Sequence, residues 1–258
     1  MKLKTDNYLQ KLVVSRFFNQ KHFHRIKLYK IIVDYLLDRD YENCKFLIKK
    51  IINEDSIVLD IGANMGQYAC RLNNHIKDGK IFSFEPYNPN FVALRSMKKI
   101  LRLNNVVPIH SAVSDKKGTL KLKIPVVNKN LVIGTQAVLE QYQSSEYDNV
   151  KYLEETVMVN TIDDFMKENN LQKVDFIKID TEGAELSVLK GGLETIKKYL
   201  PVLSIEISPS KEGLNSLYHM GYEAYYVSKN NLVPFESIVK VNKLKGNLVL
   251  MHKKGTNL

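Results

Sequence analysis

The sequence predicts an α/β protein with a mostly parallel sheet, and three observations carry this prediction. From Ser56 onward, short apolar runs alternate with amphipathic stretches, which is typical of βαβ units. The first apolar run ends in a glycine turn, "DIGANMG", and an amphipathic segment follows it. Residues 7–51 contain no Pro or Gly, which indicates two or three helices ahead of the sheet. We therefore divide the chain into an N-terminal helical extension, 1–55, and an α/β domain, 56–258.

The apolar runs give the order of the strands. We expect strands at 56–61, 80–85, 106–113, 174–180 and 201–207, with two more at 222–227 and 247–252. The alternating run 118–125 predicts an antiparallel strand with one face in solvent. The polar stretch 126–153 shows no sustained period, and an irregular stretch of this length predicts a binding loop. "TIDDF" then begins a short helix, with Thr161 and Asp164 at capping-box spacing.

Composition and charge restrict the classes of function. At 258 residues, with 44% hydrophobic and 26% charged residues, the chain resembles an ordinary globular protein. Two cysteines provide no disulfide framework, and there is no apolar run of membrane-spanning length, so we expect a cytoplasmic protein. The net charge of +10 is concentrated in residues 1–30, which hold eight Lys or Arg and one acid. Such a segment can contact an anionic partner or a membrane surface, or it can form a solvated helix face.

The glycine turn predicts a nucleotide-like cofactor. A dinucleotide site needs a second glycine two residues after Gly62, and here Asn64 stands in that place. A side chain there crowds a pyrophosphate but is compatible with S-adenosylmethionine, which has no phosphate. Asp60 is placed to accept the ammonium group of that cofactor, while the backbone from Gly62 to Gly66 curves around its methionine portion.

A second acid supports a cofactor at this edge of the sheet. Glu85 ends the second strand, and Pro86 stops the strand there. A carboxylate in this position accepts hydrogen bonds from both ribose hydroxyls of a nucleotide-like cofactor. At the end of the third strand, Ser111 and Ala112 are expected near the adenine. Each of these residues also has a purely structural interpretation, as a helix cap, a turn or a solvated strand end.

Four segments together resemble a known family. "LDIGANMGQY", "FEPYNPNF", "TIDDF" and "VDFIKIDTEGAELSVLKG", in this order and at these distances, are similar to the FkbM family of S-adenosylmethionine-dependent methyltransferases. The resemblance extends over residues 56–207. It implies the class I, Rossmann-like methyltransferase fold, with a seven-stranded, mostly parallel sheet and helices on both faces. It also implies O-methylation of hydroxyls on sugars or other polyhydroxylated small molecules.

Acids at the carboxyl ends of the fourth and fifth strands are the candidates for catalysis. In an open α/β sheet, ligands bind beyond these strand ends. Asp180 is our first choice for contact with the reacting hydroxyl and with the cofactor, followed by Glu182 and Glu206. A positioned base of this kind accelerates proton removal by roughly 10²–10⁴-fold. Glu185 is expected to stabilise the following helix N-terminus electrostatically.

Metal binding and other functions remain alternatives at this point. Two neighbouring carboxylates could hold Mg²⁺, although nothing specific in the sequence supports it, and we assign no metal ligand. A nucleic-acid methyltransferase is a second hypothesis, weakened because "DTEG" stands where an amino methylase would carry an Asn/Asp-Pro-Pro-aromatic run. The third is a non-catalytic module that docks through its basic N-terminal helices.

Overall fold

The computed structural model describes residues 20–39, 44–128, 131–132, 137–140, 151–206, 211–228, 231–235 and 247–254. Its main element is an eight-stranded sheet with the strand order β12-β11-β13-β10-β9-β1-β2-β3. The strands are β1 (Ile57–Ile61), β2 (Lys80–Phe84), β3 (Val106–Ile109), β9 (Phe176–Ile179), β10 (Val202–Glu206), β11 (Tyr222–Ser228), β12 (Asn231–Pro234) and β13 (Asn247–His252).

The sheet is parallel over its central part and antiparallel at one edge. Strands β10, β9, β1, β2 and β3 run parallel, whereas β13, β11 and β12 pair antiparallel. The prediction of a mostly parallel α/β sheet is confirmed. The number of strands differs by one, because β12 adds a hairpin to β11 at the edge. An edge hairpin buries little surface, so its residues carry a weak apolar signal.

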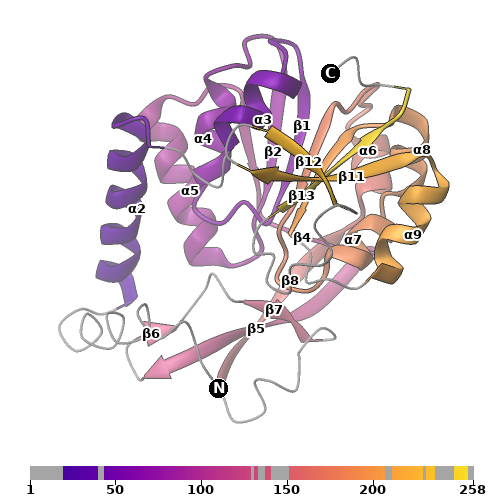
Figure 1. Cartoon of the computed structure of the whole chain (residues 1–258). Helices are drawn as coiled ribbons and strands as arrows, with labels where there is room; N and C mark the ends of the chain where they lie inside the picture. Colours follow the sequence, from indigo (N-terminus) through magenta and orange to yellow (C-terminus); the bar gives the residue numbers. More distant parts are fainter. Residues whose placement is uncertain are drawn as a thin grey trace.

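Helices cover both faces of the sheet (Figure 1). One face packs against α2 (Gln20–Leu36), α3 (Cys44–Ile51), α4 (Gln67–Asn73) and α5 (Asn88–Leu101). The other packs against α6 (Ile162–Glu168), α7 (Glu185–Lys190), α8 (Leu193–Tyr199) and α9 (Lys211–His219). Side chains alternate along β1, so that Val58 joins the first layer while Leu59 and Ile61 join the second. None of the described helices is long and apolar enough to cross a membrane.

The N-terminal helices share the core of the α/β domain. Leu28 and Ile32 of α2 and Ile48 of α3 are buried in one cluster with Val58. The prediction of helices before the sheet is therefore confirmed for α2 and α3, and residues 1–19 lie outside the described part of the chain. These helices bury apolar surface of the sheet, so removing them would expose it.

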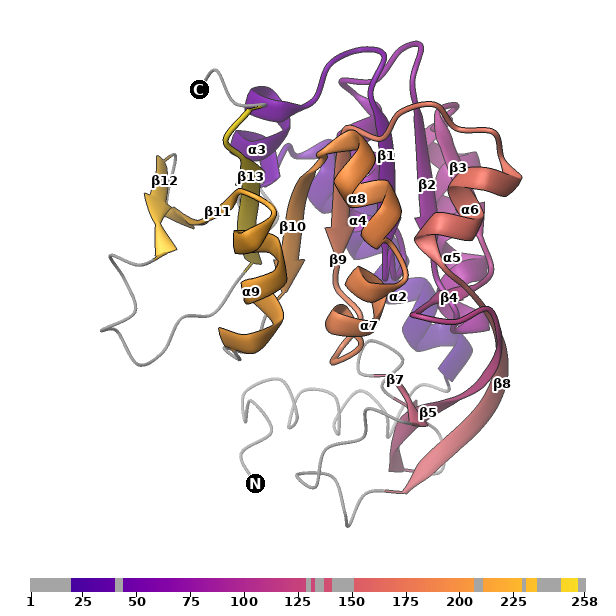
Figure 2. The same cartoon turned by 90° about the vertical axis from the view of Figure 1, so that its right-hand side faces the viewer.

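A second, smaller sheet lies beyond the carboxyl ends of the parallel strands (Figure 2). It consists of β4 (Ala112–Val113), β5 (Gly118–Asn128), β6 (Leu131–Val132), β7 (Val138–Leu139) and β8 (Tyr152–Asn160). The antiparallel pair of β5 and β8 is its longest part, and it buries Ile124 and Val157. The predicted strand at 118–125 is thus confirmed and continues to Asn128.

Two details of the predicted strands were wrong. The third strand ends at Ile109, not at Val113, because the chain crosses over and 112–113 pair with β8 in the second sheet. Residues 126–128, 131–132, 138–139 and 152–153 of the predicted irregular stretch belong to strands. The start of β8, from Tyr152 to Glu155, has no buried side chain and therefore gives no apolar signal in the sequence. Residues 129–130, 133–136 and 141–150 lie outside the described residues.

The start of α6 provides a test of the fold. Thr161 is its N-cap, and its Oγ1 accepts a hydrogen bond of 3.0 Å from the backbone N–H of Asp164. We expect Thr161→Ala to lower the free energy of unfolding by about 1 kcal/mol, because that N–H then lacks its acceptor. Thr161→Ser keeps the acceptor and should retain most of the stability in urea denaturation. Equal losses in both variants would show that the methyl group, and not the cap, matters.

Candidate active site

The turn after β1 depends on two glycines. Gly62 and Gly66 have φ of +79° and +92°, a region that side chains disfavour. A Cβ on Gly62 would lie 1.8 Å from the carbonyl oxygen of Asp180, and one on Gly66 would lie 2.3 Å from Cε of Met97 in α5. Both glycines therefore permit close approach of the turn to other parts of the chain itself. This approach brings the turn directly against the end of β9.

The backbone N–H groups of this turn all donate hydrogen bonds to acceptors within the chain. The N–H groups of Gly62 and Ala63 donate to the Phe84 carbonyl, at 3.1 and 2.9 Å. The remaining three also donate within the chain: Asn64 N–H to Glu85 Oε2 at 2.8 Å, Met65 N–H to Asn64 Oδ1 at 2.9 Å and Gly66 N–H to the Ala63 carbonyl at 2.8 Å. A phosphate-binding turn aims such N–H groups at its ligand. In this turn each of the five already has an acceptor.

Glu85 connects the glycine turn to the start of α5. Besides Asn64, its carboxylate accepts hydrogen bonds from the backbone N–H of Tyr87 at 2.9 Å and from Asn90 Nδ2 at 3.4 Å. The side chain is almost completely buried. Burial raises the pKa of Glu85 to about 7, although the hydrogen bonds from Tyr87 and Asn64 act in the opposite direction. Its predicted contact with a ribose stays a prediction.

Asp60 belongs to a row of polar side chains buried inside the sheet. In the registers of adjacent strands, Asp60 of β1 lies beside Ser83 of β2 and Lys178 of β9, which in turn lies beside Ser204 of β10. All four are at most 3% exposed. Ser83 Oγ donates a hydrogen bond of 3.3 Å to Asp60 Oδ2. Polar groups this deep cost stability unless they are paired, so such a row indicates a functional site.

Lys178 is the site residue that the sequence analysis missed. Its Nζ lies 2.8 Å from Asp180 Oδ2 and 5.6 Å from the centroid of the Tyr68 ring. The side chain is 3% exposed. The available signal was a lysine inside the apolar strand "FIKI", where an unpaired charge would be strongly disfavoured.

The three predicted catalytic acids lie together. Asp180 follows β9, Glu182 is in the next turn with φ of +52°, and Glu206 ends β10. One carboxylate oxygen from each lies within 4.8 Å of the others. Burial alone would raise the pKa of the Asp180 carboxyl, but the Lys178 ammonium and a hydrogen bond from Glu206 hold that pKa below its usual value. The pKa of Asp180 is thus held low by Lys178 and Glu206, which favours the ionised form of its carboxyl.

Glu185 has the local structural role expected of it. Its Oε1 accepts hydrogen bonds from the Thr181 backbone N–H and hydroxyl, both at 3.1 Å, and from the Gly183 N–H at 3.0 Å. These contacts close the turn between β9 and α7. This turn therefore fixes the position of Glu182.

Ser111 and Ala112 make contacts with other parts of the chain. The Ser111 hydroxyl lies 2.7 Å from the Ala112 carbonyl and 3.1 Å from the Met158 carbonyl, and it donates to these oxygens. Ala112 is buried and pairs with Val159 in the second sheet. The Ser111 oxygen can still accept a hydrogen bond, and the adenine role of both residues stays a prediction.

One group of metal-ligand side chains is present among the described residues. It is the cluster of Asp180, Glu182 and Glu206. Mg²⁺ is commonly bound by carboxylate oxygens. Three neighbouring carboxylates can equally serve as an acid–base cluster without a metal. No observation beyond this proximity supports a bound metal ion.

The arrangement of the glycine turn, Glu85 and the acids agrees with a comparison of sequences. The Methyltransferase FkbM domain matches residues 60–225 of this chain. The chain belongs to the FkbM methyltransferase family. The matched range includes Asp60, Glu85 and all three acids of the cluster.

Relatives of this FkbM chain include two proteins whose names give a position of methylation or a sugar acid. The 2-O-methyltransferase NoeI of Sinorhizobium fredii is 28% identical over 157 residues, which are 59% of this chain and 63% of NoeI. The hexuronic acid methyltransferase AglP of Haloferax volcanii is 26% identical over 147 residues, 56% of this chain and 53% of AglP. The match thus spans little more than half the length of these relatives.

A solved FkbM structure also resembles the chain. The methyltransferase FkbM of Methylobacillus flagellatus superposes with a TM-score of 0.49 and 16% identity, over 78% of this chain and 44% of that one.

The raised pKa of Glu85 predicts a dependence of stability on pH. The folded-state pKa of about 7 lies above the ordinary value of 4.5, so the folded protein holds this proton more tightly. The resulting stabilisation is complete below pH 4.5 and is lost as the pH rises through 7. Relative to Glu85→Gln, we expect the wild type to lose about 3 kcal/mol of unfolding free energy over this interval. Urea denaturation of both proteins from pH 4.5 to 8 measures it, and parallel profiles would contradict it.

Proposed function

We propose that this FkbM-family chain is an S-adenosylmethionine-dependent O-methyltransferase. The proposed acceptor is a hydroxyl of a sugar, a glycan or another polyhydroxylated small molecule. The observation that carries the proposal is the glycine turn, whose five N–H groups all donate within the chain while a buried acid stands on either side of it. This is a turn for a cofactor without a pyrophosphate.

The residues of the site are suited to this cofactor. Asp60, buried at the end of β1, would accept the ammonium group. Glu85, buried at the end of β2, would accept the ribose hydroxyls. When bound, S-adenosylmethionine supplies a sulfonium methyl group that is already activated for transfer. The task left to the protein is to align the acceptor oxygen and to take up its proton.

The acid cluster is suited to that task. Asp180, held ionised by Lys178, is an acceptor for the hydrogen of the substrate hydroxyl. During methyl transfer, the carboxylates of the cluster would take up the proton of the substrate hydroxyl. Glu206 and Glu182 complete the cluster around Asp180. Because the pKa of Asp180 is held low, its carboxylate is ionised and can both orient the hydroxyl and accept its hydrogen.

The class of acceptor is inferred from the relatives and the acids together. NoeI and AglP are named for 2-O-methylation and for hexuronic acid, respectively. Three carboxylates at one rim can accept several hydroxyl hydrogens, which suits a polyhydroxylated molecule better than an aromatic amine or a base. We therefore favour a sugar-like acceptor.

Cofactor choice is tested by calorimetry. We expect the wild type to bind S-adenosylmethionine and not NAD, because the turn offers no N–H group to a pyrophosphate. Glu85→Gln should weaken binding of S-adenosylmethionine by about 1.5–3 kcal/mol, the range for hydrogen bonds to a charged group. The matched control is Asp78→Asn, which removes an exposed carboxylate just before β2, at the opposite end of that strand. Tight binding of NAD with none of S-adenosylmethionine would refute the proposal.

The role of the acid cluster is tested by turnover. Asp180→Asn keeps the shape of the side chain and should lower kcat by roughly 10²–10⁴-fold, with a much smaller change in cofactor affinity. Lys178→Met should also lower kcat, because Asp180 would lose its ion pair. Assays of methyl transfer from labelled cofactor to a panel of sugars provide the measurement. Near-normal turnover of Asp180→Asn would move the role to Glu182 or Glu206, and loss of activity with a chelator that Mg²⁺ restores would replace it by a metal site.

A further inference from the structure

We propose that the outer face of α2, together with the cationic groove along α5, docks on the surface of an anionic lipid bilayer. This docking surface consists of apolar side chains on α2 and basic side chains on α5. It lies on the helical layer that covers one face of the sheet, away from the acid cluster at the strand ends. The inference is separate from the proposed reaction.

The outer face of α2 is apolar, although it is exposed. Ile26, Tyr29, Val33 and Leu36 recur at helical spacing, and Leu37 follows directly after the helix. Their side chains are 48–67% exposed. The opposite face of the same helix is buried in the core through Leu28, Ile31 and Ile32.

Such a helix is unusual on a protein surface. A surface helix normally presents polar side chains on the face opposite its buried one. Among the described residues, ten large hydrophobic side chains are exposed, and five of them belong to this one stripe. Their concentration marks a contact surface, whereas scattered exposed hydrophobic residues would need no explanation.

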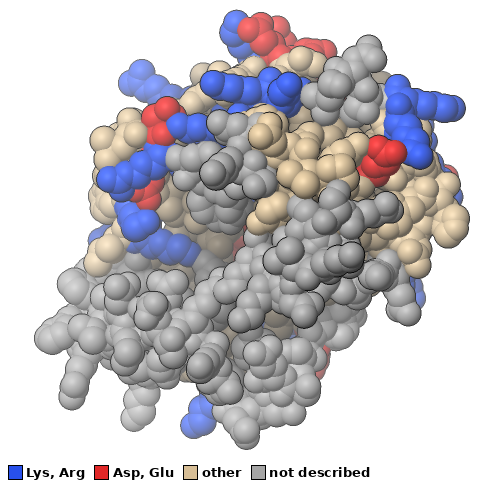
Figure 3. Space-filling view, viewed as in Figure 1, with Lys and Arg blue, Asp and Glu red and all other residues tan. Residues whose placement is uncertain are grey.

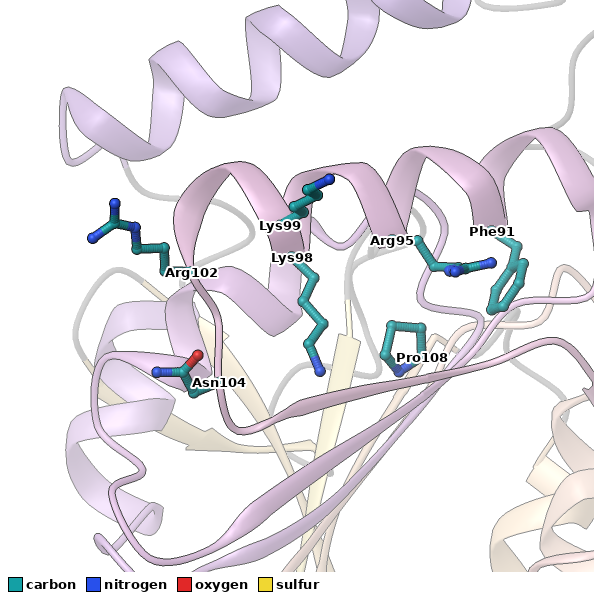
Figure 4. A pocket seen from close by; sticks show the side chains of 7 residues that line it. All are labelled: Phe91, Arg95, Lys98, Lys99, Arg102, Asn104 and Pro108. Carbon is teal, nitrogen blue, oxygen red and sulfur yellow. The ribbon is translucent and has the colours of Figure 1, made fainter.

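The neighbouring helix α5 adds positive charge to this side of the molecule. Helices α2 and α5 lie against each other. Between α5 and β3, the edge strand of the sheet, lies a groove of about 710 Å³, shown in Figure 4. It is lined by Phe91, Arg95, Lys98, Lys99, Arg102, Asn104 and Pro108. In the figure Lys99 points from α5 toward α2, while Arg95 and Lys98 point into the groove.

Few acids oppose these cations. None of the ion pairs between described residues involves Arg95, Lys98, Lys99 or Arg102. Asp34 of α2 already pairs with Lys30 at 2.9 Å and with Arg39 at 2.7 Å. Figure 3 shows several Lys and Arg side chains at the left of that view, where α2 lies, with fewer acidic side chains among them. The surface therefore combines an apolar stripe with a positive surround.

This combination selects a bilayer over other occupants. An anionic bilayer offers phosphates to the cations and acyl chains to the apolar stripe, which is the arrangement of interfacial helices. A second copy of the chain in a two-fold dimer would bring like charges together. A nucleic acid would satisfy the cations and leave the stripe exposed.

The test is co-sedimentation of the full chain with vesicles. We expect binding to vesicles of phosphatidylcholine with phosphatidylglycerol, weakened by salt, and little binding to phosphatidylcholine alone. Arg95→Gln/Lys99→Gln/Arg102→Gln should weaken binding by about 100-fold, since each cation near the surface contributes about fivefold. Tyr29→Ser/Val33→Ser/Leu36→Ser should also abolish most of it. The matched control is Lys190→Gln/Lys197→Gln/Lys198→Gln on the opposite face, which should bind as the wild type does.

Three results would overturn the proposal. The first is no binding to anionic vesicles, or an equal loss in the control variant. The second is a wild-type dimer by light scattering that the α2 variant converts to a monomer, which would assign the surface to a second copy. The third is a lower melting temperature of the α2 variant with unchanged vesicle binding, which would show that another segment of this chain covers the apolar stripe of α2.

Discussion

The site depends on the contact between the glycine turn and the end of β9. Because β1 and β9 pair in parallel up to Ile61 and Ile179, the next residues, Gly62 and Asp180, meet directly. There is no room for a Cβ on Gly62, since it would lie 1.8 Å from the Asp180 carbonyl oxygen. The same contact that shapes the proposed cofactor turn thus fixes the acid proposed to orient the acceptor. Proximity of this kind is the main requirement of methyl transfer.

A second constraint is the charge buried beneath this contact. Lys178 lies between Asp60 and Asp180 in the sheet, and all three belong to strands or strand ends that cannot move independently. A buried ion pair often contributes nothing to stability or costs some, because both ions lose their hydration. Its presence in the middle of a parallel sheet is therefore better explained by a functional requirement, namely an ionised Asp180, than by stability.

The sequence predicted the main sheet and the meeting of acids at its edge, because both depend on local pattern. Apolar runs mark buried strands, and acids at the ends of parallel strands meet at one edge, as Asp180 and Glu206 do. Features that depend on distant partners were missed. The importance of Lys178 follows from its ion pair with Asp180 and from its place between neighbouring strands. The crossing of 112–113 into the second sheet is determined by pairing with β8. Ser111 likewise bonds to a carbonyl 47 residues away.

The most direct test of the account is a crystal structure of the chain with S-adenosylhomocysteine, the cofactor after methyl transfer. The account predicts its amino group at Asp60, its ribose at Glu85, and its sulfur facing the cluster of Asp180, Glu182 and Glu206. The turn should keep its internal hydrogen bonds, because no phosphate competes for them. Binding elsewhere on the chain, or a turn reopened so that its N–H groups contact the ligand, would contradict it.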